Sequence, residues 1–237
     1  MVSMKIRLLI FIIILLLLVD LAYFYPKLTG KVIYERVMVN VTRVIDGDTF
    51  EAGDLKVRLL GINTPEKNYI YYEEAKSFLL EIQGREVELE KHGKDKYDRE
   101  LGYVFSGDVL INKKILEKGL GSLYYYGKDD YFSDMKKAEE KARKQEKGIW
   151  KKSDNYGCVE LVELKWEEQE RCKNQEQIVL NNKCNKIKAV LKDDATHIYK
   201  IDLEKGIFSK NFSCIWNNDG DSLYLWDEDG LLLFERY

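Results

Sequence analysis

Apolar and polar positions alternate along much of the first half of the chain, and this pattern predicts a series of short β-strands. Residues Val37–Val44 alternate with period two and contain several β-branched side chains, which is typical of a strand with one buried face. Apolar residues three or four positions apart predict an amphipathic helix over Tyr72–Gln83. Further runs of strand character lie at Thr49–Ala52, Leu55–Leu60, Arg85–Glu90, Leu101–Phe105 and Val109–Ile111.

Two more helices are expected near the end of this region. We expect Asn112 to cap a short helix that ends before Gly119, and Ser133 to cap a longer, highly charged helix that runs to Glu146. Five strands with helices inserted late in their order suggest a small β-barrel of the oligonucleotide-binding type, with helices added to it. The predicted fold class is therefore mainly β with helices.

The pattern changes from Cys158 onward. This part has short strand-like runs separated by turns rich in Asn, Asp and Gly, which predicts a small all-β sandwich. We therefore expect an N-terminal segment over residues 1–26, a barrel over residues 37–152 and a sandwich over residues 158–237. The strand-like runs of the sandwich are Val159–Leu164, Glu176–Leu180, Thr196–Ile201, Ser222–Trp226 and Leu231–Phe234.

The N-terminal segment has the pattern of an export signal. Lys5 and Arg7 precede an apolar run over Leu8–Val19, as in a secretory signal. The bulky residues over Leu21–Tyr25 leave no clear cleavage site after the apolar run. Counted through Tyr25, the mostly apolar segment has about 18 residues, which is close to the minimum for spanning a membrane. We expect an uncleaved membrane anchor with the rest of the chain outside the cell. A cleaved signal that leads to secretion is the first alternative, and a buried core helix is the second.

Cysteine usage also favours export. The four cysteines all follow the predicted barrel, and in an oxidising compartment they would form two disulfides in one of three connectivities. The chain has no C-x-x-C motif, so a zinc site is only weakly indicated, and free thiols are a further alternative. The cysteines are Cys158, Cys172, Cys184 and Cys214.

Composition narrows the class of function. A hydrophobic content of 45% with 33% charged residues is ordinary for a globular protein and argues against long disorder. The formal net charge of −3 argues neither for nor against a nucleic-acid partner. However, neither half of the chain has the strongly basic balance of a protein that coats nucleic acid by charge alone. Any nucleic-acid function must therefore come from a local site.

Three short motifs offer such a site. They are Ile45–Thr49, Val57–Glu66 and Asp95–Arg99. Taken alone, each has an ordinary structural explanation as a turn, a solvated strand or a helix entry. Taken together, they contain what hydrolysis of a phosphodiester requires.

The chemistry needs three kinds of group, and the motifs contain each of them. A hard cation needs oxygen ligands, which Asp48, Asn63 and the Thr64 carbonyl can provide. An attacking water needs a base, and the Glu66 carboxylate suits that role. The negative phosphate needs cationic donors in a fixed fork, which Arg58 and Arg99 offer.

With these motifs in this order, residues 37–150 resemble the staphylococcal nuclease (thermonuclease) family. The resemblance extends to Leu101–Tyr103, to the Gly119–Leu120 step and to Gly148–Trp150. It implies a calcium-dependent endonuclease that cleaves DNA, RNA or both and leaves 3′-phosphate ends.

The resemblance also assigns roles to individual residues. It implies that Asp48, Asn63 and Thr64 bind calcium, with Asp46 near the ion. It implies that Glu66 activates the water and that Arg58 and Arg99 stabilise the transition state, with Arg99 facing the leaving 5′ oxygen. The family's phosphate and base contacts would fall on Lys96, Tyr97 and Tyr125, although simple packing is an equal alternative for Tyr125.

One position departs from the pattern. Asn63 stands where the type member of the family has Asp, so the site has one negative charge fewer and its metal affinity is in doubt. Because Arg58, Glu66 and Arg99 are all present, we expect an active enzyme. The alternative is a catalytically decayed module that binds nucleic acid or a surface ligand.

The C-terminal part resembles the immunoglobulin-like lamin-tail domain that accompanies some exported nucleases. The resemblance rests on Glu176–Asn182, Leu191–Asp194 and Trp216–Leu225. It implies a sandwich fold, and the sequence identifies no partner for it.

Overall fold

The computed structural model describes residues 11–20, 34–124, 129–165, 176–194, 197–212, 215–216 and 221–236. The chain divides into two units, Met1–Arg36 and Val37–Tyr237. In the first unit, residues 11–20 form a helix. None of the helices within the ranges described combines the length and the apolar character needed to cross a membrane. The predicted anchor over residues 1–26 lies for the most part outside the described residues.

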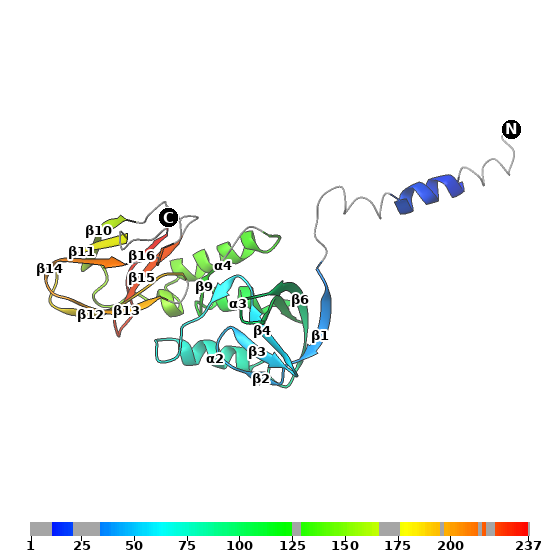
Figure 1. Cartoon of the computed structure of the whole chain (residues 1–237), viewed down its shortest axis with the longest axis horizontal. Coiled ribbons are helices and arrows are strands. Elements are labelled where there is room, and N and C mark those ends of the chain that lie inside the picture. Colours follow the sequence, from blue (N-terminus) through cyan, green and yellow to red (C-terminus); the bar gives the residue numbers. More distant parts are fainter. Residues whose placement is uncertain are drawn as a thin grey trace. The chain divides into compact units, whose positions relative to one another are not determined.

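The first part of the second unit is a β-barrel (Figure 1). Its sheet has the strand order β1-β6-β7-β4-β3-β2, with β8 paired to β7. Because β1 and β2 follow one another in the chain, the bent strand that they form borders both β6 and β3 and closes the sheet. Counted in this way, the barrel has five principal strands, and the sixth predicted run forms the short strand β8. A mainly β fold with helices is confirmed. The strands are β1 (Arg36–Asn40), β2 (Arg43–Val44), β3 (Thr49–Ala52), β4 (Leu55–Leu59), β6 (Glu86–Lys94), β7 (Glu100–Ser106) and β8 (Val109–Leu110).

Three helices and a small sheet complete this part. The helices are α2 (Tyr72–Leu80), α3 (Ile111–Glu117) and α4 (Phe132–Lys144), followed by a 3-10 turn at Gly148–Trp150. The short strands β5 (Ile62–Asn63) and β9 (Ser122–Leu123) pair antiparallel. The barrel core consists of buried apolar residues from the strands and from the inner faces of α2, α3 and α4, among them Phe50, Val57, Leu59, Leu79, Leu89, Val104, Ile115 and Met135.

Both predicted helix caps are wrong. Asn112 lies inside α3 with no exposed surface, and its amide donates to the carbonyls of Leu60 and Gly102 while its oxygen accepts from Val104. This residue therefore ties α3 to β4 and β7. Ser133 lies inside α4, and the Asp129 carboxylate accepts the N–H groups at the helix start instead. In both cases a tertiary or neighbouring partner outweighs the local capping preference.

The remaining strands, which we call the C-terminal strands, form two antiparallel sheets that share one core. The first sheet contains β10 (Val159–Lys165), β11 (Glu176–Asn182) and β14 (Gly206–Phe212). The second has the order β13-β12-β15-β16, with β12 (Ile187–Lys192), β13 (Ile198–Leu203), β15 (Ser222–Trp226) and β16 (Leu231–Arg236). The strands β12 and β14 were not among the strand-like runs predicted from the sequence. The immunoglobulin-like relation stays a prediction.

One disulfide joins the C-terminal strands to the turn that precedes β12. It links Cys158 and Cys184, so the prediction that these cysteines form bridges is confirmed for one pair. Cys172 and Cys214 lie outside the described residues.

The second sheet also packs against the barrel. Its outer face places Tyr224 and Leu231 against Trp150 and Ala142 in one buried cluster. The Trp226 indole donates to the Ile149 carbonyl at 2.9 Å. In Figure 1, α4 lies between the barrel strands and the strands β15 and β16. Residues 153–157, the gap between the two predicted domains, are therefore part of a packed junction, where the Ser153 hydroxyl donates to Asp227 at 2.6 Å.

An ion pair crosses the same junction. Glu139 on α4 has no exposed surface, and its carboxylate accepts from Arg236 on β16 and from the Leu123 N–H. Arg236 also donates to the hydroxyls of Ser222 and Tyr224. The last strand of the chain therefore supplies the charge that balances a buried carboxylate in the barrel part.

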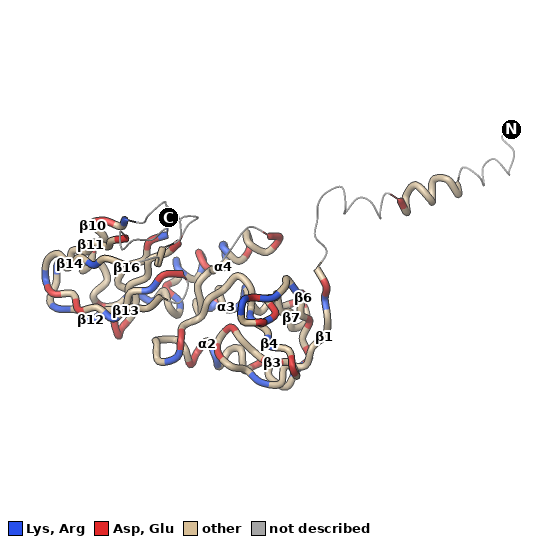
Figure 2. Tube along the Cα trace, viewed as in Figure 1, with Lys and Arg blue, Asp and Glu red and all other residues tan. Residues whose placement is uncertain are grey.

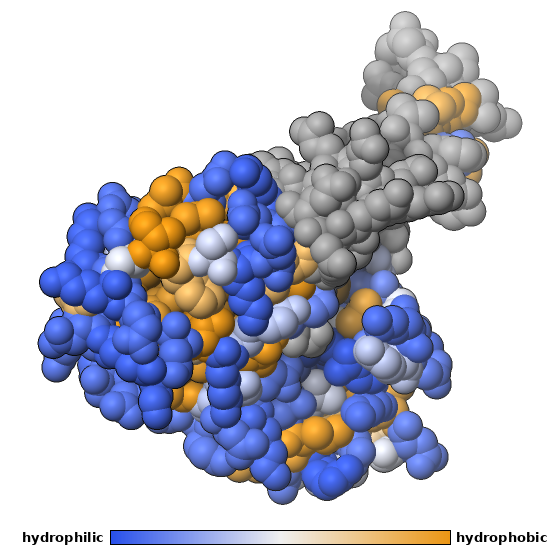
Figure 3. All heavy atoms as spheres, turned by 60° about the vertical axis from the view of Figure 1, so that its left-hand side comes forward, coloured by the Kyte–Doolittle hydropathy of each residue, from blue (hydrophilic) through white to orange (hydrophobic). Residues whose placement is uncertain are grey.

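The surface is mixed in charge and in polarity. Figure 2 shows Lys and Arg interspersed with Asp and Glu over both the barrel and the C-terminal strands, in keeping with a net charge of −3. Figure 3 shows bands of hydrophobic residues between hydrophilic ones on the face that it presents. Any recognition of nucleic acid must therefore depend on how a few residues are arranged.

Candidate active site

A tight turn between β2 and β3 begins the site. Gly47 lies in this turn, and a Cβ at this position would lie 2.7 Å from Ala75 and 2.8 Å from the Thr64 hydroxyl. Such contacts are too short for any side chain, so a glycine is needed for α2 and Thr64 to approach the turn. The Asp46 carboxylate accepts the Asp48 N–H at 3.1 Å, which fixes the turn and brings two carboxylates close together.

Asp48 is the centre of the site. It is buried, and its Oδ1 accepts from Arg58 and from the Thr49 hydroxyl at 2.9 Å. Its Oδ2 accepts the backbone N–H of Thr64 at 3.0 Å and the Thr64 hydroxyl at 3.1 Å. A carboxylate accepts about four hydrogen bonds, so Asp48 is fully occupied by donors from β3, β4 and the segment after β5.

The pKa values of the two carboxylates in the turn are shifted in opposite directions. Burial alone would raise the pKa of Asp48, but the charge and hydrogen bond of Arg58 hold it below its ordinary value. Burial and the neighbouring Asp48 charge raise the pKa of Asp46 to about 6. The site is therefore rich in negative charge that Arg58 only partly balances.

Arg58 joins Asp48 to Asn63. Its neighbours on β4, Val57 and Leu59, lie in the barrel core, so alternation places the Arg58 side chain on the opposite face. Its guanidinium donates to Asp48, to the Asn63 side-chain oxygen at 3.3 Å and to the Ile62 carbonyl at 3.4 Å. The structure thus brings together Asp48, Arg58, Asn63 and Thr64, four of the residues expected from the sequence.

Asn63 has a second partner that the sequence did not reveal. Its amide nitrogen donates to the backbone carbonyl of Asp194, in the segment after β12, at 2.9 Å. Asp194 is held in turn by the hydroxyls of Tyr224 and Ser222 at 2.7 and 3.0 Å. A carboxylate has no hydrogen to donate to this carbonyl, which gives a physical reason for an amide at position 63.

Arg99 is held in a separate turn beside this network. The Asp95 carboxylate accepts the N–H groups of Tyr97 and Arg99 at 2.8 and 3.0 Å, and also the Arg99 side-chain Nε at 2.7 Å. Lys96 and Arg99 both lie over the exposed ring of Tyr97, 5.1 and 5.4 Å from its centroid. Arg99 directly precedes β7, which pairs in parallel with β4, the strand that carries Arg58. The fold therefore places Arg99 just before the strand that adjoins the one carrying Arg58.

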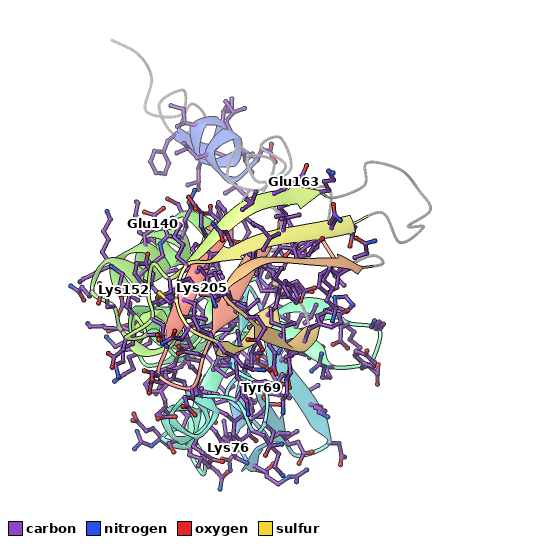
Figure 4. The ribbon with its side chains drawn as sticks, turned by 90° about the vertical axis from the view of Figure 1, so that its left-hand side faces the viewer. Tyr69, Lys76, Glu140, Lys152, Glu163 and Lys205 are labelled. Carbon is purple, nitrogen blue, oxygen red and sulfur yellow. A yellow bond between two sulfur atoms is a disulfide. The ribbon has the colours of Figure 1, made fainter. Side chains whose placement is uncertain are left out.

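Glu66 lies on the wall of a cavity. The cavity has a volume of about 460 Å³, and the segment Asn63–Ile70 faces the strands β12 and β13 across it. Figure 4 shows Tyr69, from the same segment, near α2 and on the side of the C-terminal strands. Glu66 is exposed, as a base that must reach water has to be. Tyr125, the remaining candidate for substrate contact, lies outside the described residues.

The donors of this site fit a hard divalent cation. Among the described residues, no three His, Cys, Asp or Glu side chains are grouped as a metal site. However, Asp46 and Asp48 supply adjacent carboxylates and Asn63 supplies an amide oxygen, which are the oxygen donors that calcium prefers. Because Asp48 is fully occupied, a cation has to displace one of its donors. The hydroxyls of Thr49 and Thr64 can rotate away without leaving a buried backbone group unpaired.

Comparison with known proteins places the barrel part in a family. A family profile described as "Staphylococcal nuclease homologue" matches residues 56–152. The thermonuclease of Staphylococcus intermedius is 34% identical over 126 residues, which cover 47% of this chain and 75% of that protein. The chain belongs to the staphylococcal nuclease family. An uncharacterized endonuclease of Escherichia coli O157:H7 is also 30% identical over 122 residues, covering 48% of this chain and 77% of that protein.

The family profile covers only part of the site. Residues 56–152 include Arg58, Asn63, Glu66 and Arg99, but they end before the C-terminal strands begin. Asp194 therefore touches the candidate site of a staphylococcal nuclease family member from outside the matched segment. A local signal for β12 exists in its alternation of apolar residues with lysines, whereas no local signal indicates that this strand faces Glu66.

Proposed function

We propose that this chain is a calcium-dependent nuclease that hydrolyses phosphodiester bonds of DNA, RNA or both. The observation that carries the proposal is the hydrogen-bonded network of Asp48, Arg58, Asn63 and Thr64, in a member of the staphylococcal nuclease family. The buried Asp48 carboxylate beside a fixed guanidinium, together with an exposed Glu66, supplies groups that the reaction requires.

Each residue has a role in this proposal. Asp48, Asn63 and the Thr64 carbonyl would hold calcium, which when bound polarises the phosphate oxygens and offsets their charge. The Glu66 carboxylate accepts a proton from the attacking water. Arg58 and Arg99 donate hydrogen bonds to the phosphate oxygens as negative charge develops on them.

The same residues set the products. With Arg99 donating toward the leaving 5′ oxygen, cleavage leaves a 3′-phosphate on one fragment and a 5′-hydroxyl on the other. Lys96, Tyr97 and Tyr125 would contact the phosphates and bases of the substrate near the scissile bond.

The test is digestion of single-stranded and double-stranded DNA and RNA with calcium and with excess chelator. We expect cleavage in calcium and none in chelator, because the bound ion is the largest local charge in the site. Arg58→Lys should reduce kcat by about 10²–10³. Arg43→Lys is the matched control, since Arg43 is a surface arginine paired with Glu51 on the same sheet. Binding of nucleic acid without cleavage in any condition would favour the decayed, binding-only alternative.

We also propose that the protein is exported and that the segment over residues 1–26 anchors it in the membrane, with the cleaved, secreted form as the alternative. The Cys158–Cys184 disulfide supports export, because such bonds persist in oxidising compartments. Fractionation of the native cells tests this, since a protein found only in the cytosol would contradict both forms. The resemblance of the C-terminal strands to a lamin-tail domain stays a prediction.

A further inference from the structure

The outer face of the sheet β13-β12-β15-β16 has two halves with different surroundings. On β12, Ile187, Ala189 and Leu191 lie in the core, so alternation places Lys188, Val190 and Lys192 on the outer face. The β15 and β16 half of this face is covered by Trp150 and its neighbours. The β12 and β13 half instead forms one wall of the cavity beside Glu66.

The opposite wall belongs to the candidate active site. It is the segment Asn63–Ile70, which carries Glu66 and Tyr69. The two walls are fixed to each other by the hydrogen bond from Asn63 to Asp194 and by the one from Trp226 to Ile149. The cavity is therefore a continuation of the site, and its second wall comes from the C-terminal strands.

Three lysines of this wall line the cavity. Within the part of the chain that the structure describes, Lys188 and Lys200 are exposed, and their side chains form no hydrogen bond or ion pair. Lys192 is only 8% exposed, and its ammonium donates to the Asp193 carbonyl at 3.0 Å.

Four acidic residues, Glu66, Asp202, Asp227 and Glu228, also line the cavity, and two of them have partners outside it. Asp202 is paired with Lys186 at 3.1 Å. Asp227 accepts hydrogen bonds from Ser153 and Asn155. Within the described residues none of these carboxylates is paired with Lys188 or Lys200, so both lysines remain available to an incoming anion.

Apolar and aromatic side chains lie between these charges. They are Ile70, Tyr69, Val190, Ile198 and Trp226. Cationic groups that follow a phosphate backbone, together with apolar and aromatic surfaces that receive bases, are the features of single-strand binding sites. In a duplex the base faces are stacked on one another and are not available to such a wall.

We propose that this cavity binds unpaired nucleotides of the substrate strand adjacent to the scissile phosphate, with Lys188 and Lys200 contacting the phosphates. The proposal rests on the proposed nuclease function. A volume of about 460 Å³ lies within the range of about 300–1,000 Å³ typical of small-ligand sites, which suits a short piece of one strand. The C-terminal strands thus make the enzyme selective for single-stranded substrate.

The test compares the full chain with Lys188→Ala/Lys200→Ala. Both lysines are exposed, so the variant should fold. For a single-stranded oligonucleotide we expect KM to rise about fivefold with kcat unchanged. This is the change in binding expected from the loss of two surface ion pairs with phosphates. In calcium-free buffer, the slope of log affinity against log salt should fall by about 1.4, from the loss of two phosphate contacts.

Two controls separate the outcomes. Lys183→Ala/Lys205→Ala removes the same charge from turns between the C-terminal strands, outside the cavity, and should behave as the wild type. A nitrophenyl phosphodiester, too small to reach the cavity, reports the chemistry alone and should be cleaved equally by all three proteins. If the wild type cleaves neither that diester nor the oligonucleotide, the proposed function fails. If it cleaves the oligonucleotide, and the cavity variant matches the wild type in KM and salt slope, the cavity proposal is overturned.

Discussion

Substituting Asn63 by Asp tests two features of the site at once. In the native protein the Asn63 amide donates to the Asp194 carbonyl at 2.9 Å, and Asn63 is 5% exposed. The carboxylate of Asn63→Asp would place an oxygen opposite that carbonyl and leave it without a donor. A buried acceptor without a partner costs about 1–3 kcal/mol, so in chelator we expect a loss of stability of that size.

Calcium should reverse part of this loss. The new carboxylate adds a full negative charge to the proposed ion site, and ligand charge is a main determinant of calcium affinity. Calcium at 100 times its dissociation constant stabilises a protein by about 2.7 kcal/mol. The variant should therefore gain more stability from a given calcium concentration than the wild type, and it should reach half-maximal activity at less calcium.

The assay is urea unfolding in chelator and over a calcium titration, at one pH and ionic strength, together with a calcium titration of activity. Asn182→Asp is the matched control, because the Asn182 amide donates to the carbonyls of Asn185 and Leu203 at 2.8 and 2.9 Å, in the C-terminal strands. It should lose similar stability and show no change in calcium requirement. An unchanged stability of Asn63→Asp in chelator would refute the role of the Asp194 contact. An unchanged or higher calcium requirement would show that Asn63 does not touch the ion.

Three further predictions concern other parts of the chain. Arg99→Lys should lower kcat by about 10²–10³ and leave the urea midpoint within error, because an ammonium lacks the guanidinium fork. Arg236→Ala should lower the free energy of unfolding by about 3–5 kcal/mol in urea titrations, since it leaves the buried Glu139 carboxylate without its cation. Mass spectrometry of the exported protein should show a second disulfide, between Cys172 and Cys214.

Each of these has a result that would contradict it. Activity of Arg99→Lys within twofold of the wild type would make Arg99 an ordinary surface residue. The free energy of unfolding of Arg236→Ala could instead lie within about 1 kcal/mol of the wild-type value, which is the loss expected for an exposed ion pair. That result would show that the Glu139 carboxylate does not depend on the Arg236 cation. Free thiols at both remaining cysteines would count against the second bridge and against the compartment.

Local sequence patterns predicted the structure correctly where the interacting residues lie close together in the chain. The alternation of Val37–Val44 and the turn at Gly47 predicted strands that the structure contains. Asp48, Arg58 and Thr64 lie within 16 positions of one another, and their motif predicted that they would meet. Such short separations involve one hairpin and one adjoining segment, so local geometry limits the possible contacts.

Local patterns failed where a partner lies far away in the chain. Asn112 is a residue type that often caps helices, but hydrogen bonds to the carbonyls of Leu60 and Gly102 hold it inside a helix. The departure at Asn63 predicted weaker calcium binding, and nothing near it in the chain indicated Asp194. A hydrogen bond between a side chain and a distant backbone group does not change the hydrophobic periodicity of either segment, so the sequence pattern does not reveal it.

The contact between Asn63 and Asp194 has a consequence for how the protein is assembled, because it joins residues 131 positions apart. A chain is made from its N-terminus, and contacts between distant residues form late because a long loop has to close first. Every side chain around Asp48 from the barrel is present before Asp194 has been synthesised. The barrel side chains of the candidate site are therefore synthesised first, and the wall beside Glu66, to which we assign the binding of single strands, is synthesised last.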